Sequence, residues 1–134
     1  MLELIFVIVV LGILGAIAIP KFAATRDDAT VAKGRSDVAS IRSAIINERQ
    51  TRIIKGDTDW VEKLEPDGAT ELFSNVLMYP QKDSQKSGHW HKKDDDGHYT
   101  FYINTTECDF TYDNDDGTFT LDDNQDSKCD DLVK

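Results

Sequence analysis

The sequence holds very few cysteines, and their placement excludes one class of protein. Cys108 and Cys129 are the two in the chain, and no histidine or further cysteine lies next to either. A structural zinc site needs four grouped ligands, so this pair does not supply one. One disulfide is the simpler interpretation and implies an oxidising compartment outside the cytoplasm. Two buried free thiols are the alternative.

Positive charge is scarce where most of the polar surface lies. Residues 1–55 hold eight Lys and Arg against five Asp and Glu, a net charge of +3, whereas residues 56–134 hold seven against twenty, a net charge of −13. Phosphate binding needs Lys and Arg, so we expect no nucleic-acid partner for the isolated chain. The sequence also lacks a nucleophile–base pair and a cofactor loop, so we do not expect an enzyme.

Charge is absent from residues 4–19, an apolar run broken only by Gly12 and Gly15. No Lys or Arg precedes the run and no small-x-small cleavage site follows it, so it does not match a secretory signal peptide. A helix over residues 1–24 would approach the thickness of the hydrocarbon core of a bilayer, ~30 Å. These residues are therefore predicted to form a membrane anchor that stays on the mature protein.

Apolar residues continue at helical spacing beyond this run. They are Val31, Val38, Ile41 and Ile45. We predict a helix over residues 22–55, ended by Gly56 as a C-cap. Joined to the anchor, it makes a rod of about 55 residues, or ~80 Å at 1.5 Å per residue. The rest of the chain is too short to cover such a rod, so its N-terminal part must contact lipid or other protein.

Two features of this rod concern helix geometry and packing. Gly12 and Gly15 lower helix propensity and Pro20 removes a backbone hydrogen bond, which predicts a kink or local unwinding between residues 12 and 20. Small side chains further along would permit close approach by other helices. They are Ala23, Ala24, Ala29, Ala32 and Gly34.

The remainder of the chain predicts a small antiparallel sheet. One or two short helical turns are expected to begin near Asp57 and Asp67 and to stop at Pro80, followed by a loop over residues 81–88. Alternating or clustered β-branched and aromatic residues predict strands over 98–103, 108–112 and 118–121, with a hairpin turn at 113–117. The fold class is therefore α+β, a long helix whose C-terminal half packs on a sheet.

Acidic clusters near the C-terminus raise the question of calcium, which prefers several oxygen ligands on a bent loop. The candidate ligands are Asp113, Asp115, Asp116, Asp122 and Asp123. Their spacing does not match the EF-hand loop. A solvated acidic surface is the favoured interpretation and Ca²⁺ is the alternative; no other cofactor is expected.

The N-terminal residues resemble the type IV pilins and type II secretion pseudopilins. That family's signature is a cleaved glycine followed by Phe-Thr-x-x-Glu and an apolar run ending in Ile-Pro. MLELIFVIVVLGILGAIAIP is similar to it from the third mature position onward, and the step from Glu3 to Pro20 equals the family's own glutamate-to-proline step. The resemblance implies a Phe-Thr pair before Met1. It covers residues 1 to about 35 closely, and the remainder in layout only, including a C-terminal disulfide loop.

The resemblance implies a pilin fold divided into a transmembrane or filament-core half (residues 1–24) and a globular domain (residues 25–134). The subunit would wait in the bacterial inner membrane, be processed and N-methylated by a prepilin peptidase, and then be stacked by an assembly machine into a helical homopolymer. Glu3 would pair with the N-terminal amine of a neighbour. Contacts between apolar helices would include Phe6, Leu11 and Leu14. Gly12, Gly15 and Pro20 would form a segment that unwinds on assembly.

Within this family two functions remain open. The first is the major subunit of an extracellular type IV pilus, used for adhesion, motility or DNA uptake, which the cysteine pair favours. The second is the major pseudopilin of a type II secretion system, forming a periplasmic pseudopilus, which the chain length and the acid-rich end favour. Outside the family, a membrane-anchored binding protein that works alone is the alternative.

Overall fold

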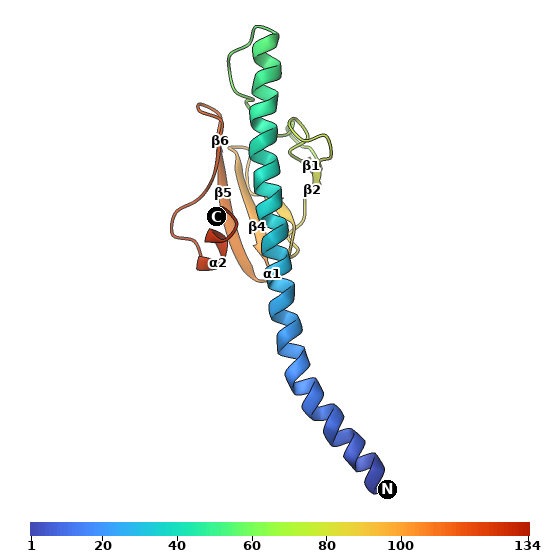
Figure 1. The fold of residues 1–134 in the computed structure, drawn as a ribbon. Helices are drawn as coiled ribbons and strands as arrows, with labels where there is room; N and C mark the ends of the chain where they lie inside the picture. Colours follow the sequence, from blue (N-terminus) through green and yellow to red (C-terminus); the bar gives the residue numbers. More distant parts are fainter.

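One long helix organises the molecule. The computed structural model describes all 134 residues, apart from the side chain of Ala23. The prediction that Ala23 permits close approach by another helix therefore lies outside the described residues. Helix α1 (Leu2–Ile54) is continuous over 53 residues. Its C-terminal half lies against the sheet, and its N-terminal half extends away as a stem inclined to the upper part (Figure 1). The predicted rod and its end near Gly56, which has a φ of 90°, are confirmed.

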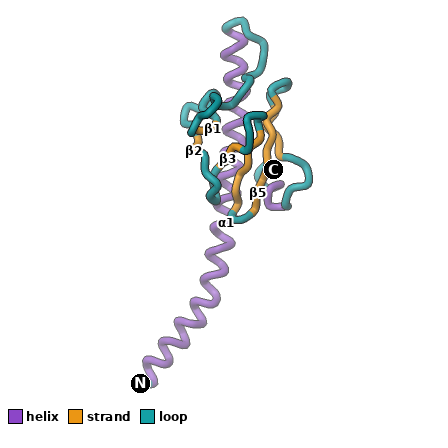
Figure 2. Tube along the Cα trace, turned by 180° about the vertical axis from the view of Figure 1, so that it is seen from behind, coloured by secondary structure: helices purple, strands orange, loops and turns teal.

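The remaining elements form two small sheets and one short helix. They are β1 (Glu71–Leu72), β2 (Gln81–Lys82), β3 (Trp90–Lys92), β4 (His98–Ile103), β5 (Thr106–Asp113), β6 (Thr118–Leu121) and α2 (Ser127–Asp130). Strands β1 and β2 pair with each other, and β3-β4-β5-β6 form an antiparallel sheet in that order. Seen from behind, the strands lie along the upper half of α1 (Figure 2). The predicted α+β layout with a long N-terminal helix is confirmed.

The core lies between α1 and the sheet. Val38, Ile41 and Ile45 of α1 are at most 1% exposed. They face a cluster of aromatic rings with centroids 4.8 to 6.0 Å apart. The rings belong to Phe73, Trp90, Tyr99, Phe101, Phe110 and Phe119. Burial of such large side chains stabilises the fold by roughly 1.5–3 kcal/mol each.

At Gly34 the sheet side of the molecule approaches the α1 backbone closely. A Cβ atom added there would lie 2.6 Å from Leu132 Cδ2 and 2.6 Å from Phe101 Cε1. Real Cβ atoms do not make contacts this short, so the position requires glycine. Gly34 was expected to admit other helices. The structure corrects that interpretation, because this glycine admits the chain's own sheet and C-terminal tail.

The segment between α1 and β2 differs from the prediction. Short helices were expected after Asp57 and Asp67, but the segment consists of bends, turns and the two-residue strand β1. Val61, Leu64 and Leu72 are buried in the core, although the segment that carries them is not helical. Phe73 adopts a positive φ of 61°, incompatible with a helix. The predicted loop over 81–88 likewise begins with β2.

The C-terminal tail is fastened to the sheet by a disulfide. Cys108 in β5 and Cys129 in α2 are bonded, with their Cα atoms 5.4 Å apart, and both are fully buried. The predicted disulfide is confirmed, and the alternative of two free thiols is excluded. Asp126 caps α2 by accepting a hydrogen bond from the Lys128 N–H at 2.9 Å. This helix was not predicted, because four residues carry no helical periodicity.

Candidate assembly surface

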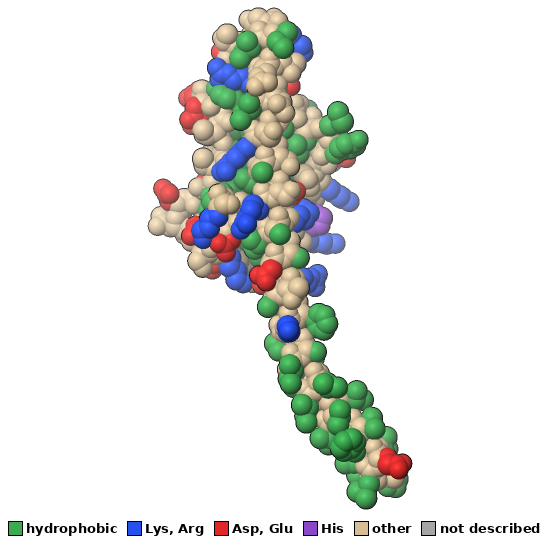
Figure 3. Space-filling view, in the orientation of Figure 1, with side chains coloured by type: hydrophobic (Ala, Val, Ile, Leu, Met, Phe, Trp, Pro, Cys, Tyr) green, Lys and Arg blue, Asp and Glu red, His purple; other side chains and the backbone are tan. Residues whose placement is uncertain are grey.

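The stem formed by the apolar half of α1 (residues 1–24, hereafter the apolar half) is the largest unpartnered surface of the molecule. The space-filling view shows it covered by hydrophobic side chains (Figure 3). Helix α1 is long and apolar enough at this end to cross a membrane, and none of that window is buried. A signal sequence would pass the same test, so this feature alone is weak support for membrane association. It does require contact with lipid or with other protein, because exposed apolar area of this extent is unfavourable in water.

The side chains expected to mediate subunit contacts are all accessible. Phe6, Leu11 and Leu14 are 70%, 61% and 58% exposed. At 100° per residue, Leu11 is rotated by about 140° from Phe6, so these side chains spread around the helix. The apolar half therefore offers no single seam, and contact with lipid or several neighbouring helices would cover it better than one partner.

Glu3 is the only charged side chain in the first twenty residues. It lies in the first turn of α1, where the helix dipole favours a carboxylate. Among the side chains that the structure describes, Glu3 forms no ion pair. A carboxylate in this position is accessible to a cation supplied from outside the chain.

The segment that was predicted to kink or unwind is part of one continuous helix in this structure. Residues 12–20 are helical throughout, with Pro20 inside α1. A Cβ atom at Gly12 or Gly15 would meet no atom within 4 Å, so neither glycine is required by packing within the chain. Local unwinding is thus absent from the isolated chain, and unwinding on assembly stays a prediction.

The five candidate calcium ligands are not brought together. Asp113, Asp115 and Asp116 lie in the β5–β6 hairpin, whereas Asp122 and Asp123 follow β6 at its other end, about 13 Å away for a four-residue strand. Asp122 accepts a hydrogen bond from the Thr111 hydroxyl at 2.7 Å. Within the described residues, no group of three or more acidic, histidine or cysteine side chains is placed to hold a metal ion. Calcium binding stays an untested prediction.

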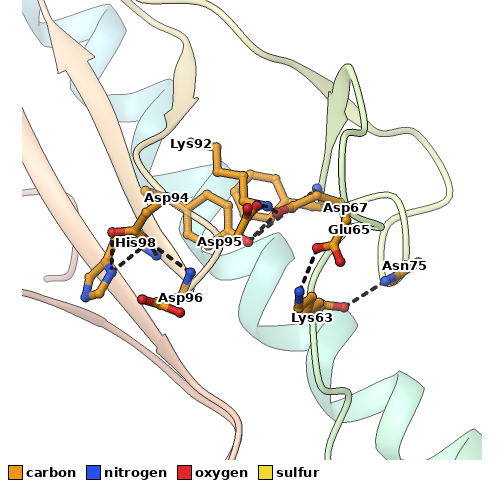
Figure 4. A network of polar contacts seen from close by, with 11 residues as sticks. Lys63, Glu65, Asp67, Asn75, Lys92, Asp94, Asp95, Asp96 and His98 are labelled. Carbon is orange, nitrogen blue, oxygen red and sulfur yellow. Dashed lines mark hydrogen bonds and ion pairs between the residues drawn. The ribbon is translucent and has the colours of Figure 1, made fainter.

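A buried polar network that sequence reasoning missed supports the sheet (Figure 4). The carboxylate of Glu65 is 1% exposed and accepts hydrogen bonds from the Phe73 N–H at 3.0 Å and the Tyr99 hydroxyl at 2.8 Å. Lys92 forms ion pairs with Glu65 at 3.1 Å and with Asp95 at 2.9 Å. Glu65 thereby holds Phe73 in its positive-φ conformation. No signal in the sequence distinguishes this glutamate from its solvent-facing neighbours.

The electrostatics of this network follow from its burial. Burial raises the pKa of the Tyr99 hydroxyl far above its ordinary value, and the adjacent Glu65 carboxylate raises it further. Burial by itself would lower the pKa of Lys92, but hydrogen bonds with Asp95 and Glu65 outweigh it and raise that pKa. The network therefore keeps Tyr99 neutral and Lys92 charged at ordinary pH, as suits a structural support.

A search among known proteins identifies no relative for this chain: no family model, no curated protein and no solved structure matches it.

Proposed function

We propose that this protein is the structural subunit of a type IV pilus, which polymerises into a helical extracellular filament through its apolar half. The observation that carries the proposal is that apolar half, exposed around its whole circumference, with one lone carboxylate at Glu3. Before assembly the same surface would contact the lipid of the bacterial inner membrane. After assembly it would contact the apolar halves of identical subunits.

The free energy of burying apolar side chains supports contact of the apolar half with lipid before assembly and with sister helices afterwards. Each large apolar side chain that leaves water contributes roughly 1.5–3 kcal/mol, so burial of the apolar half among sister helices is strongly favourable. Helices already in lipid gain less, because lipid is as apolar as the helices themselves. A specific polar contact is then needed to set register, and Glu3 with the terminal amine of a neighbour would provide one. Removal of one member of such a buried pair costs roughly 3–5 kcal/mol.

The disulfide favours the pilus over the pseudopilus. The bond closes the acidic C-terminal tail onto β5, as in the C-terminal disulfide loop of the pilins that the sequence resembles. The cell surface and the periplasm are both oxidising, so the preference rests on that resemblance and not on the compartment. The alternative function, the major pseudopilin of a type II secretion system in a periplasmic pseudopilus, is supported by the acid-rich C-terminal quarter. Loss of protein secretion on deletion of the gene would favour that alternative.

Electron microscopy of material sheared from cells at native expression tests the proposal. We expect long thin filaments whose subunit, by mass spectrometry, has a methylated N-terminus generated by a prepilin peptidase. A chain that stays monomeric in detergent, with no filaments at the cell surface or in the periplasm, would instead indicate a membrane-anchored protein that works alone.

A further inference from the structure

Three arginines follow one another at seven-residue steps along one flank of α1. Arg35, Arg42 and Arg49 (hereafter the arginine row) are each separated by ~10.5 Å along the axis and lie on nearly the same side of the helix. Although the chain has ten more acidic than basic side chains, none of the three forms an ion pair within 4 Å with any side chain the structure describes. Their charges are therefore not neutralised by a direct ion pair among the described side chains.

Two of these side chains are already fixed in place. The Arg35 Nε–H donates a hydrogen bond to the Asp131 carbonyl oxygen at 2.9 Å, and the Arg42 Nε–H donates to the Phe119 carbonyl oxygen at 2.9 Å. Each bond leaves both terminal amino groups of the guanidinium unused. An anchored guanidinium loses little rotamer entropy on binding, and its two outer amino groups match the two oxygens of a carboxylate.

The third arginine lies beside an acidic turn of its own chain. The Arg49 guanidinium lies over the Trp60 ring at 4.0 Å, and that ring packs on Gly117 of the β5–β6 hairpin so closely that a Cβ atom has no room there. Arg49 and Asp115 border the same surface hollow. Within one chain, the hairpin therefore lies at the same height along the α1 axis as Arg49. Arg42 and Arg35 precede Arg49 by 7 and 14 residues, which places them about 10–21 Å nearer the N-terminal end of α1 at 1.5 Å per residue.

The hairpin itself carries unpaired negative charge. Asp113, Asp115 and Asp116 are exposed. Asp113 and Asp116 accept hydrogen bonds only from Asp115 and Thr118, within the hairpin. No Lys, Arg or His of the described chain forms an ion pair with any of the three. This acidic hairpin projects from the end of the sheet far from the stem (Figure 1).

We propose that the acidic hairpin of one copy of this chain binds Arg35 and Arg42 of a neighbouring copy, displaced by about 10–21 Å along α1. This contact rests on the proposed filament and sets the stagger of its globular domains. Because neighbours in the proposed filament are all displaced in the same direction along α1, the contact is heterologous, and it continues as an open-ended array where the rotation between copies does not close a ring.

The charge distribution selects a second copy over other anionic partners. A net charge of −10 repels any polyanion, a second copy of the chain included, but a second copy also brings the Lys and Arg side chains of its own α1, which a nucleic acid lacks. Arg42 borders a hollow with Asp122, Asp123 and Asp130, which weakens its attraction for a further carboxylate. Arg35 lies near Asp131, but that carboxylate is already paired with Lys134 at 2.8 Å, so Arg35 is expected to contribute more than Arg42.

Charge reversal in the full chain, with sheared filaments as the readout, tests the contact. Arg35→Glu and the double change Asp115→Lys with Asp116→Lys are each expected to lower filament yield at least tenfold, and their combination to restore it to within threefold of the unaltered chain. Lys55→Glu is the matched control, since Lys55 is an exposed, unpaired cation at the end of α1 outside the row, and it is expected to leave the yield unchanged.

A thermal unfolding midpoint, measured on each full-length variant in detergent, separates loss of contact from loss of fold. Unchanged filament yield in Arg35→Glu overturns the proposal, as does failure of the combined swap to restore filaments although the variant is folded. If the unaltered chain forms no filaments at all, the proposed function fails and this contact fails with it. If filaments form regardless of these charges, only the contact is wrong.

Discussion

In the proposed function, Glu3 would combine a charge with an environment that is apolar before and after assembly. It has no partner in the described chain, so its ionised state must be stabilised by water at the membrane surface or by a cation from a neighbour. In the proposed filament, only a correctly placed subunit supplies that cation. In that filament Glu3 would select register more than it would add affinity.

Replacement of this charge tests its role directly. Glu3→Gln keeps the shape of the side chain but leaves a neighbouring terminal amine unpaired at a cost of roughly 3–5 kcal/mol, so we expect at least a tenfold fall in sheared filament yield. Leu2→Gln is the control, because it adds the same amide at the adjacent position while Glu3 is retained. Equal yields from Glu3→Gln and the unaltered chain would exclude a role in assembly.

Tyr112 makes the stability of the globular domain depend on alkaline pH. Its hydroxyl donates to the Val61 carbonyl oxygen at 2.6 Å, and burial raises its pKa to about 12. A tyrosine in the unfolded chain has a pKa of about 10, so the unfolded state loses its proton first as the pH rises. The contribution of Tyr112 to the free energy of unfolding is therefore fully present below pH 10. It is lost between pH 10 and 12, by about 1.4 kcal/mol per pH unit.

Tyr99, whose pKa is also raised, adds a second contribution of the same sign. Urea unfolding of the full chain in detergent at pH 9, 10, 11 and 12 measures the combined slope. Tyr112→Phe is expected to be less stable at pH 9 by about 1 kcal/mol, because one hydrogen bond is lost. Its free energy of unfolding should, however, fall less steeply with pH between pH 10 and 12, because one fewer group loses a proton on unfolding. An identical slope in both proteins would show that Tyr112 does not titrate in this range.

At the scale of elements, the contact between α1 and the sheet depends on a glycine in the middle of a helix. Gly34→Ala would improve helix propensity by up to ~1 kcal/mol but would place a Cβ atom 2.6 Å from Leu132 and Phe101. Overpacking of this kind costs roughly 1–3 kcal/mol. We expect a net loss of stability, seen as a lower thermal midpoint, whereas Gly12→Ala, where no atom lies within 4 Å, keeps only the gain in helix propensity and does not lower the midpoint. A midpoint for Gly34→Ala at or above that of the unaltered chain would contradict this account.

The disulfide holds the C-terminal tail over the sheet. A bond between residues 21 apart restricts the unfolded chain by about 3 kcal/mol, so replacement of Cys108 and Cys129 by serine is expected to destabilise the domain by that amount. A reducing agent should lower the stability of the unaltered chain and leave the double variant unaffected. Equal sensitivity of both proteins to the reductant would indicate that it acts elsewhere.

The elements that the sequence predicts well are those with their own periodicity. Strands β4 and β6 were predicted at their observed bounds and β5 within two residues, because alternation places Tyr99, Phe101 and Phe110 on one face. Strands β1, β2 and β3 are two or three residues long and exist through pairing, which a local pattern does not encode. The arginine row was not predicted because a charge on a helix gives no indication of whether it finds a partner.

The segment between α1 and β2 shows why local patterns fail there. In this segment apolar and acidic residues occur at a spacing typical of helices, but Pro66 and Gly68 interrupt the pattern. Glu65 then turns inward, against the usual preference of a carboxylate for water, because the Phe73 N–H, Tyr99 and Lys92 surround it. Those partners are 8 to 34 residues away, so the arrangement exists only once the sheet has formed.

At the scale of the whole molecule, apolar surface and charge are separated along the chain. Most of the exposed large hydrophobic side chains, 15 of 21, lie in the apolar half, whereas the excess negative charge lies in residues 56–134. This separation favours insertion of one end in a bilayer while the other end stays in water. It also keeps globular domains apart until specific contacts form, because like charges repel.

This separation predicts that the full chain behaves as an integral membrane protein before assembly. Membranes from cells without the assembly machine should retain the chain through washes with 1 M salt and alkaline carbonate, and release it only in detergent. Val10→Lys combined with Ile13→Lys places two charges near the middle of the apolar run, at roughly 2.5–3.5 kcal/mol each, and should make the chain extractable without detergent.

Ser40→Lys combined with Ser43→Lys is the matched control, because it adds the same two charges on the exposed side of α1 within the globular domain. That variant should remain in the membrane. Release of the unaltered chain by salt alone would mean that electrostatic attraction to the surface, and not insertion of the apolar half, holds it there. The apolar half would then need a protein partner even before assembly, since water cannot accommodate it.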